Sequence, residues 1–158
     1  MKIMKQISAL LLGIIMVLSL AACSQSEKVV VLRGDMTAEM SGIPTIDTWT
    51  LTAKGDTVKT VKEVFELDLS EYDDETIKAL TSSFESLMVE PAKKIDGVEC
   101  TAQMKGNTYV IELTVNCSGD AVKKAAEADL LTIDGTSDRI SLKQTQSSLE
   151  KQGYKVVE

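Results

Sequence analysis

The chain has 158 residues, of which 44% are hydrophobic and 26% are charged, an ordinary composition for a single globular domain. Two of the 17 basic residues and none of the 24 acidic residues precede Cys23, so 15 basic and 24 acidic residues follow it, a net charge of −9. Such an acidic surface repels phosphate groups, which argues against binding of nucleic acid and against adhesion to anionic headgroups through protein charge.

The first 22 residues have the pattern of an export signal. Lys2 and Lys5 are followed by an apolar stretch from Ile7 to Leu20. This stretch has about 14 residues, fewer than the roughly 20 that a spanning helix needs, so a cleaved signal is favoured over an uncleaved transmembrane anchor. Ala21 and Ala22 are small, as cleavage by a signal peptidase requires.

The string Leu20-Ala21-Ala22-Cys23 looks like the lipobox of bacterial lipoproteins, in which the cysteine sulfur takes a diacylglyceryl group and cleavage occurs just before it. Two acyl chains supply the double signal that stable anchoring requires, at roughly 0.8 kcal/mol per buried CH₂. We therefore expect a signal peptide at residues 1–22, a lipidated Cys23 with a polar tether over 23–28, and one domain over 29–158. The domain should lie on the extracytoplasmic face of the cell membrane.

Two long strands joined by a tight turn are predicted near the start of this domain, after a short β-branched run at Val29–Arg33. Residues 45–53 alternate, with Trp49, Leu51 and Ala53 on one side. Lys54-Gly55-Asp56 is a turn signal, and alternation resumes over residues 57–69. The pattern predicts a β-hairpin.

A helix is expected next. Asp73, Asp74 and Glu75 place negative charge at its start, where the helix dipole favours it. Apolar residues then recur at steps of three and four and predict one apolar stripe: Ile77, Leu80, Phe84, Leu87 and Met88. Glu90-Pro91 and Asp96-Gly97 are expected to close the helix.

A second hairpin is the clearest local signal in the chain. Apolar residues alternate with polar ones from Val98 to Met104, and again from Tyr109 to Val115 after Gly106-Asn107. A two-residue turn pairs Met104 with Tyr109, which keeps both apolar sets on one face.

The last third of the chain predicts two shorter helices and a closing strand. Ser118 is expected to cap an Ala-rich helix that reaches about Ala128, and Ser141–Gln144 has the spacing of a capping box. Gly153 has the position of a C′ glycine, and Tyr154–Val157 is expected to be a strand. The order of elements predicts an α+β domain, with a mostly antiparallel sheet of two hairpins and two to three helices packed on one face.

The sequence contains no histidine. This excludes Ser-His-Asp and Cys-His catalysis and histidine-ligated zinc. Zinc held by three cysteines is also excluded, because Cys23 is expected to carry lipid. There is no Gly-rich phosphate loop and no Gly-x-Ser-x-Gly motif. We therefore expect a protein that is not an enzyme and has no cofactor beyond the covalent lipid.

Cys100 and Cys117 remain after the lipidated cysteine, and an even number in an exported chain permits a disulfide. The predicted hairpin places Cys100 opposite Leu113, with Cys117 about four residues further on, or roughly 13 Å, against a Cα limit near 7 Å for a disulfide. A bulge or bend after Val115 would bring the two together. Both cysteines also fall on the apolar face, where a free cysteine behaves as a small hydrophobe. Buried thiols are favoured, and a disulfide is the alternative.

Two acidic segments could be read as metal sites. The first lacks the loop spacing of an EF-hand and is better explained as a helix start; its members are Asp68, Glu71, Asp73, Asp74 and Glu75. The second, Asp134–Asp138, contains glycine and is better explained as a turn. No metal site is expected.

One aromatic residue is a candidate for ligand contact. With one Trp, two Phe and three Tyr, a sugar-stacking platform is hard to build, although spacing leaves paired carboxylates for glycoside hydrolysis open. Phe65, Phe84 and Tyr109 lie on apolar stripes and are expected in the core. Trp49 shares its strand face with only Leu51 and Ala53, so it is the candidate.

The chain resembles the YehR-like family of small bacterial lipoproteins. The likeness rests on the order and spacing of four segments: Leu20-Ala21-Ala22-Cys23, Phe65–Ser70 leading into Asp74–Lys78, the hairpin opened by Ile95–Val98, and the terminal helix from Ile140–Leu142 to Gly153–Lys155. The resemblance implies a compact α+β domain at the cell surface, of uncharacterised molecular role, with no catalytic residues to transfer. It does not extend to Cys100 and Cys117.

The expected function is a non-enzymatic surface module, held to the membrane by its lipid, that binds a peptide, a small molecule or an envelope partner. A structural or assembly component of an envelope complex is the first alternative. A cell-wall hydrolase is the second, and it predicts a concave cleft lined by at least two acidic residues with raised pKa values.

Overall fold

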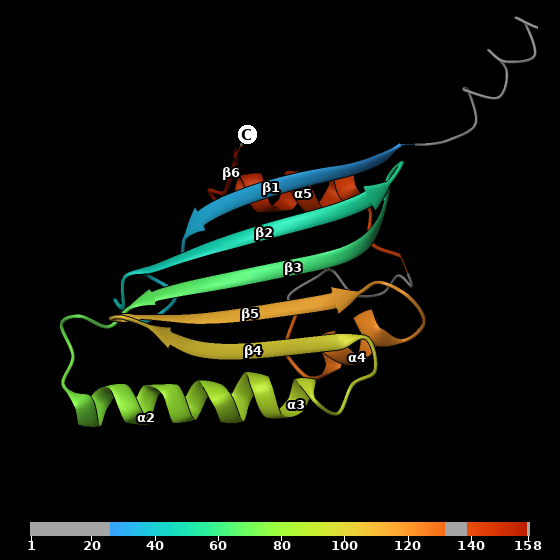
Figure 1. Cartoon of the computed structure of the whole chain (residues 1–158). Coiled ribbons are helices and arrows are strands. Elements are labelled where there is room, and N and C mark those ends of the chain that lie inside the picture. Colours follow the sequence, from blue (N-terminus) through green and yellow to red (C-terminus); the bar gives the residue numbers. More distant parts are fainter. Residues whose placement is uncertain (1–25, 132–138, 158) are drawn as a thin grey trace, which may run out of the picture.

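The computed structural model describes residues 26–131 and 139–157 (Figure 1). These residues form one antiparallel six-stranded sheet in the order β4-β5-β3-β2-β1-β6. The strands are β1 Glu27–Asp35, β2 Thr45–Lys54, β3 Thr57–Asp68, β4 Val98–Lys105, β5 Thr108–Asn116 and β6 Lys155–Val157. The helical segments are α2 Asp74–Phe84, the π-helical turn η1 Glu85–Val89, α3 Glu90–Ala92, α4 Ala121–Glu127 and α5 Leu142–Lys151. Cys23 and the loop over 134–138 lie outside the described residues, and no described helix has the length and apolarity needed to cross a bilayer.

The helices cover one face of the sheet. In Figure 1, α5 lies behind β1 and β2, while α2 and α3 run along the side of the sheet that ends in β4. Buried residues of the covered strand face, α4 and α5 belong to a single hydrophobic core, against which α2 also packs. The predicted α+β class is therefore confirmed.

Both predicted hairpins are confirmed, the second with its predicted register. In the first, Leu51 pairs with Val61, and a bulge between Thr52 and Ala53 shifts the last pairs before the turn. In the second, Met104 pairs with Tyr109 and Cys100 with Leu113. A β3–β5 ladder joins the two hairpins into one sheet, a pairing that alternation alone does not predict.

The first helix begins as expected but changes its winding. Asp73 is the N-cap, and its carboxylate accepts a hydrogen bond from the Thr76 amide at 2.8 Å. The π-helical turn η1 takes up an extra residue, so the positions within it depart from the 3.6-residue period of the preceding helix. Leu87 therefore points to solvent, with 68% of its surface exposed, while Val89 is buried. The prediction that Leu87 shares one face with the rest of the apolar stripe is wrong for this reason.

In the C-terminal part, the N-cap of α4 differs from the predicted residue. Asp120, without a side-chain capping bond, precedes α4, so the prediction of Ser118 as the cap is wrong. Ser141 caps α5 as expected, with its hydroxyl accepting from the Gln144 amide at 3.3 Å. Gly153 follows α5 with a φ of +97°, a conformation that glycine adopts without strain. The closing strand β6 then pairs with the outer edge of β1.

Candidate functional site

Two carboxylic acids lie on the covered face of the sheet, among apolar side chains. Asp47 on β2 has 0% of its surface exposed, and Glu63 on β3 has 6%. Because Trp49 pairs with Glu63 and Asp47 pairs with Phe65, the two acids are diagonal neighbours across adjacent strands. Such burial is costly for ionised groups unless they find partners.

One carboxylate oxygen of Asp47 accepts two hydrogen bonds. Its Oδ2 accepts a hydrogen bond from the indole Nε1 of Trp49 at 2.7 Å and another from the hydroxyl of Tyr154 at 2.6 Å. Its Oδ1 is fully buried and has no partner of good hydrogen-bond geometry among the described residues. The neighbouring polar group is the carboxyl of Glu63, which interacts with Asp47 directly.

The pKa values of both acids are raised. Burial, and then the charge of Asp47, raise the pKa of Glu63 well above its usual range. Burial also raises the pKa of Asp47, against the opposing effect of the hydrogen bonds from Tyr154 and Trp49. Glu63 therefore keeps its proton to a higher pH than an exposed glutamate. Burial and the bond to Asp47 raise the pKa of Tyr154 as well, so its hydroxyl stays a neutral donor.

Contacts at both ends hold helix α5 against the sheet beside Asp47 and Glu63. At its start, Asp56 in the β2–β3 turn accepts from the Ser141 hydroxyl at 2.7 Å and from the Lys143 amide at 3.0 Å. At its end, Tyr154 reaches Asp47, and its ring packs so close to β1 that a Cβ on Gly34 would lie 2.8 Å from it. The absence of a side chain at Gly34 thus makes room for Tyr154.

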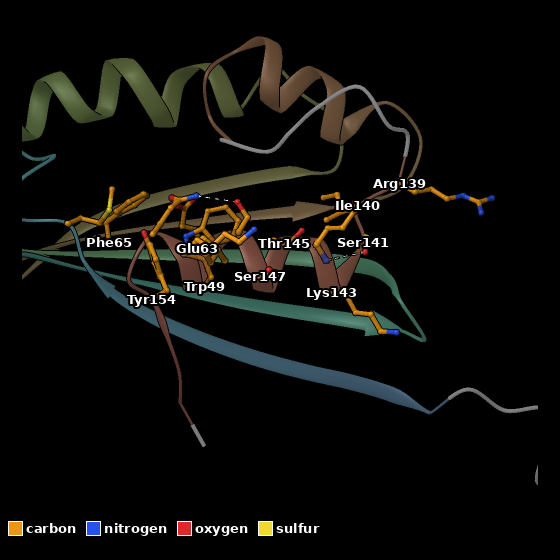
Figure 2. A pocket seen from close by; sticks show the side chains of 16 residues that line it. Trp49, Glu63, Phe65, Arg139, Ile140, Ser141, Lys143, Thr145, Ser147 and Tyr154 are labelled. Atoms are coloured by element: carbon orange, nitrogen blue, oxygen red, sulfur yellow. Dashed lines mark hydrogen bonds between the residues drawn. The ribbon is translucent and has the colours of Figure 1, made fainter.

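A pocket of about 750 Å³ lies between α5 and the sheet (Figure 2). Glu63 lines it, together with the aromatic residues Trp49, Phe65 and Tyr154. Arg139, Lys143 and Lys151 also contribute to the lining, and Figure 2 shows the side chains of Arg139 and Lys143 directed outward at one end. The remaining lining residues are Met36, Ile140, Ser141, Gln144, Thr145, Ser147, Ser148, Leu149 and Gln152. The volume is in the range of small-molecule sites.

Of the residues singled out in the sequence, Trp49 is part of this pocket. It is almost fully buried, and its indole N–H is bonded to Asp47, so only part of its ring borders the cavity. Contact between Trp49 and a ligand stays a prediction.

Cys100 and Cys117 lie away from the pocket and are free thiols in the structure. Cys100 is buried on β4, and Cys117 is half-buried just after β5. Burial raises the pKa of each thiol to about 11. Neither is therefore a reactive thiolate at neutral pH.

The acidic segment at the start of α2 has structural partners. Asp73 caps the helix, and Asp68 accepts from the Ser70 amide at 2.9 Å. Across the described residues, no group of three or more histidine, cysteine or acidic side chains is arranged to hold a metal ion.

Asp47, Glu63 and Tyr154 were not recognised as site residues from the sequence. The signal was nevertheless present for the two acids, because both occupy inward positions in strands whose polar and apolar residues largely alternate. Asp47 lies two residues before Trp49, and Glu63 lies between Val61 and Phe65. An acidic residue at such a position is exceptional and marks a candidate site.

The sequence model of a family described as "Protein of unknown function (DUF1307)" matches residues 36–155. The chain belongs to the DUF1307 family. The match spans β2 to β5, α5 and all the lining residues of the pocket, and begins just after β1. A comparison with curated proteins gives no match.

Two solved structures share the DUF1307 fold of this chain. The NMR structure of the E. coli YehR protein superposes with a TM-score of 0.66 at 16% identity, covering 84% of this chain and 92% of that one. The NMR structure of a protein from Streptococcus pneumoniae TIGR4 has a TM-score of 0.56 at 15% identity, covering 84% and 86%. The expected resemblance to YehR-like proteins is thereby confirmed. At this identity the likeness establishes the fold alone.

Proposed function

We propose that this DUF1307 protein is an exported, lipid-anchored envelope protein that binds a small ligand in the pocket between α5 and the sheet. The observation that carries the proposal is a pocket of about 750 Å³ with a nearly buried carboxyl, Glu63, in its wall. An apolar residue at this position would fit the core at lower cost, since replacing buried charged groups with hydrophobic ones is often neutral or stabilising. A buried acid beside a cavity therefore supports a role in binding.

The geometry favours binding over hydrolysis. A hydrolase with paired carboxylates needs both acids in contact with substrate. Glu63 lines the pocket, but Asp47 does not, and one oxygen of Asp47 is already bonded to Trp49 and Tyr154. The pair is thus arranged as a buried polar anchor beside the ligand space.

Export and lipid anchoring rest on the sequence of the first 23 residues. The test compares globomycin-treated and untreated cells, and wild type with a Cys23→Ala variant. Anchoring predicts a shorter, membrane-bound, fatty-acid-labelled product that neither the treated cells nor the variant makes. Products of equal length without fatty acid would refute this part of the proposal.

Ligand binding is tested by a thermal-shift screen of small envelope and nutrient compounds, including amines, sugars, amino acids and short peptides. Thr145 lines the pocket, so Thr145→Phe fills it; Gln146 is also half-buried on α5 but does not line the pocket, so Gln146→Phe is the matched control. A true ligand raises the Tm of wild type and control but not of Thr145→Phe. The proposal fails if no compound binds, or if every compound shifts both variants equally.

A further inference from the structure

We infer that the ligand of this pocket is a small organic cation, an alkyl- or arylalkylammonium, and that Glu63 is the group that binds its charged end. The inference rests on the proposed function and names the ligand class. It starts from the carboxyl of Glu63, which lines the pocket while 6% exposed, and from the fully buried Oδ1 of Asp47 beside it, which has no partner of good hydrogen-bond geometry among the described residues.

The carboxyl and aromatic groups of the pocket favour a cationic ligand. Buried acceptors are nearly always paired, so an ionised Glu63 beside Asp47 needs a donor in place of its proton. An ammonium group offers three N–H donors and no acceptor, and its charge matches the carboxylate. The walls beside Glu63 are Trp49, Phe65 and Tyr154, whose ring faces attract cations and whose bodies suit an apolar stem. A neutral or anionic group at this position offers no positive charge to replace that proton.

Binding then exchanges a proton for the ligand. Burial and the charge of Asp47 raise the pKa of Glu63, so below that raised pKa the empty pocket holds a protonated Glu63. When the ammonium enters, the O–H bond of Glu63 breaks, the proton leaves to solvent, and N–H donors bond to the carboxylate, with no oxidation or reduction. The two carboxylates and the bound ammonium together carry one net negative charge. This equals the charge of the acid pair when it holds one proton.

Other charged or titratable groups facing Glu63 are few. Asp47 on β2 and Tyr154 after α5 interact with it directly, and Cys100 on β4 is near enough to be affected by its charge. Arg139, Lys143 and Lys151 line the pocket on the α5 side. These cations disfavour a polyamine, so the ligand should carry a single ammonium group.

The test is calorimetry on the full mature lipoprotein in detergent, with phenethylamine as the probe and with 2-phenylethanol and phenylacetate as its neutral and anionic counterparts. We expect the amine to bind about tenfold or more tightly than the alcohol, since a charge-assisted hydrogen bond is involved. Titrations in two buffers of different ionisation enthalpy should show close to one proton released per amine bound. The affinity should rise by up to about tenfold per pH unit while Glu63 is protonated in the empty pocket.

Two variants assign the effect to Glu63. Glu63→Gln keeps the shape and removes the charge, and should weaken amine binding by about tenfold or more. Glu66→Gln, on the exposed face of the same strand, should leave the affinity unchanged. If Glu63→Gln does not fold, the preference of the wild type for the amine over the alcohol still decides the matter.

The outcomes separate this inference from the proposed function. Equal affinity for amine and alcohol, preference for phenylacetate, or amine binding that Glu63→Gln does not weaken would overturn the cation assignment and leave a ligand pocket in place. The same holds if none of the three probes binds while the thermal-shift screen yields a compound blocked by Thr145→Phe. Failure of both the probes and the screen overturns both.

Discussion

Replacement of Glu63 by Gln should change how the stability of the fold depends on pH. The folded state holds the Glu63 proton more tightly than the unfolded chain does, because burial and Asp47 raise its pKa well above the ordinary value of 4.5. A raised pKa means that its contribution to stability is complete below pH 4.5 and is lost as pH rises toward the folded-state pKa. In Glu63→Gln this loss is absent.

The magnitude follows from proton linkage. One proton bound in the folded state and absent from the unfolded state costs about 1.4 kcal/mol of unfolding free energy per pH unit within that window. Urea unfolding followed by the emission of Trp49, the single tryptophan, measures this from pH 4.5 upward. The difference between Glu63→Gln and wild type should widen in favour of the variant as pH rises and then become constant.

A control variant tests whether the effect is specific to Glu63, and one result would refute the reasoning. Glu66→Gln removes an acid from the same strand, where Glu66 forms a surface ion pair with Arg33 at 3.6 Å, and it should follow the wild-type curve closely. If Glu63→Gln and wild type lose or gain stability in parallel over this window, Glu63 does not hold its proton in the fold, and the description of the acid pair is wrong.

Three further predictions concern contacts around the pocket and the cysteines. Tyr154→Phe removes the 2.6 Å bond to Asp47 and should lower the unfolding free energy by about 1.5–3 kcal/mol, as for hydrogen bonds to charged groups, measured by urea denaturation. Gly34→Ala places a Cβ 2.8 Å from the Tyr154 ring and should cost about 1–3 kcal/mol, and a double-mutant cycle with Tyr154→Ala should show that most of this cost vanishes once the ring is gone. Cys100 and Cys117 should resist iodoacetamide in the native protein at pH 7 because burial holds both pKa values at about 11. On the denatured, unreduced protein each thiol should add one adduct, whereas a disulfide between them would leave both unmodified.

Controls for the first two predictions come from residues of similar type. Tyr72→Phe alters a half-buried tyrosine outside the pocket and should change stability by less than Tyr154→Phe does. An unchanged stability in Tyr154→Phe would mean that the bond to Asp47 contributes nothing net. A cost for Gly34→Ala that persists in the Tyr154→Ala background would place its origin in the β1 backbone.

The sequence alone determined the local structure of this protein. Alternation set the strands on either side of Gly55 and Gly106, and the Gly106-Asn107 turn fixed the register of the second hairpin, because a one-residue slip would place every apolar side chain on the wrong face. Ser141 and Gly153 marked the two ends of α5 through bonds that span only a few residues. These signals act over short distances in the chain, so a single sequence carries them.

Only the tertiary structure decided the site. Tyr154 meets Asp47 across 107 residues, and Ser141 meets Asp56 across 85, so neither contact has a local signature. The π-helical turn that exposes Leu87 overrides a helical period that the sequence continues without a break. Inward positions for Asp47 and Glu63 could be read from alternation. Their closeness could not, because it depends on the register between β2 and β3, and the pocket beside them depends on where α5 packs once the sheet has formed.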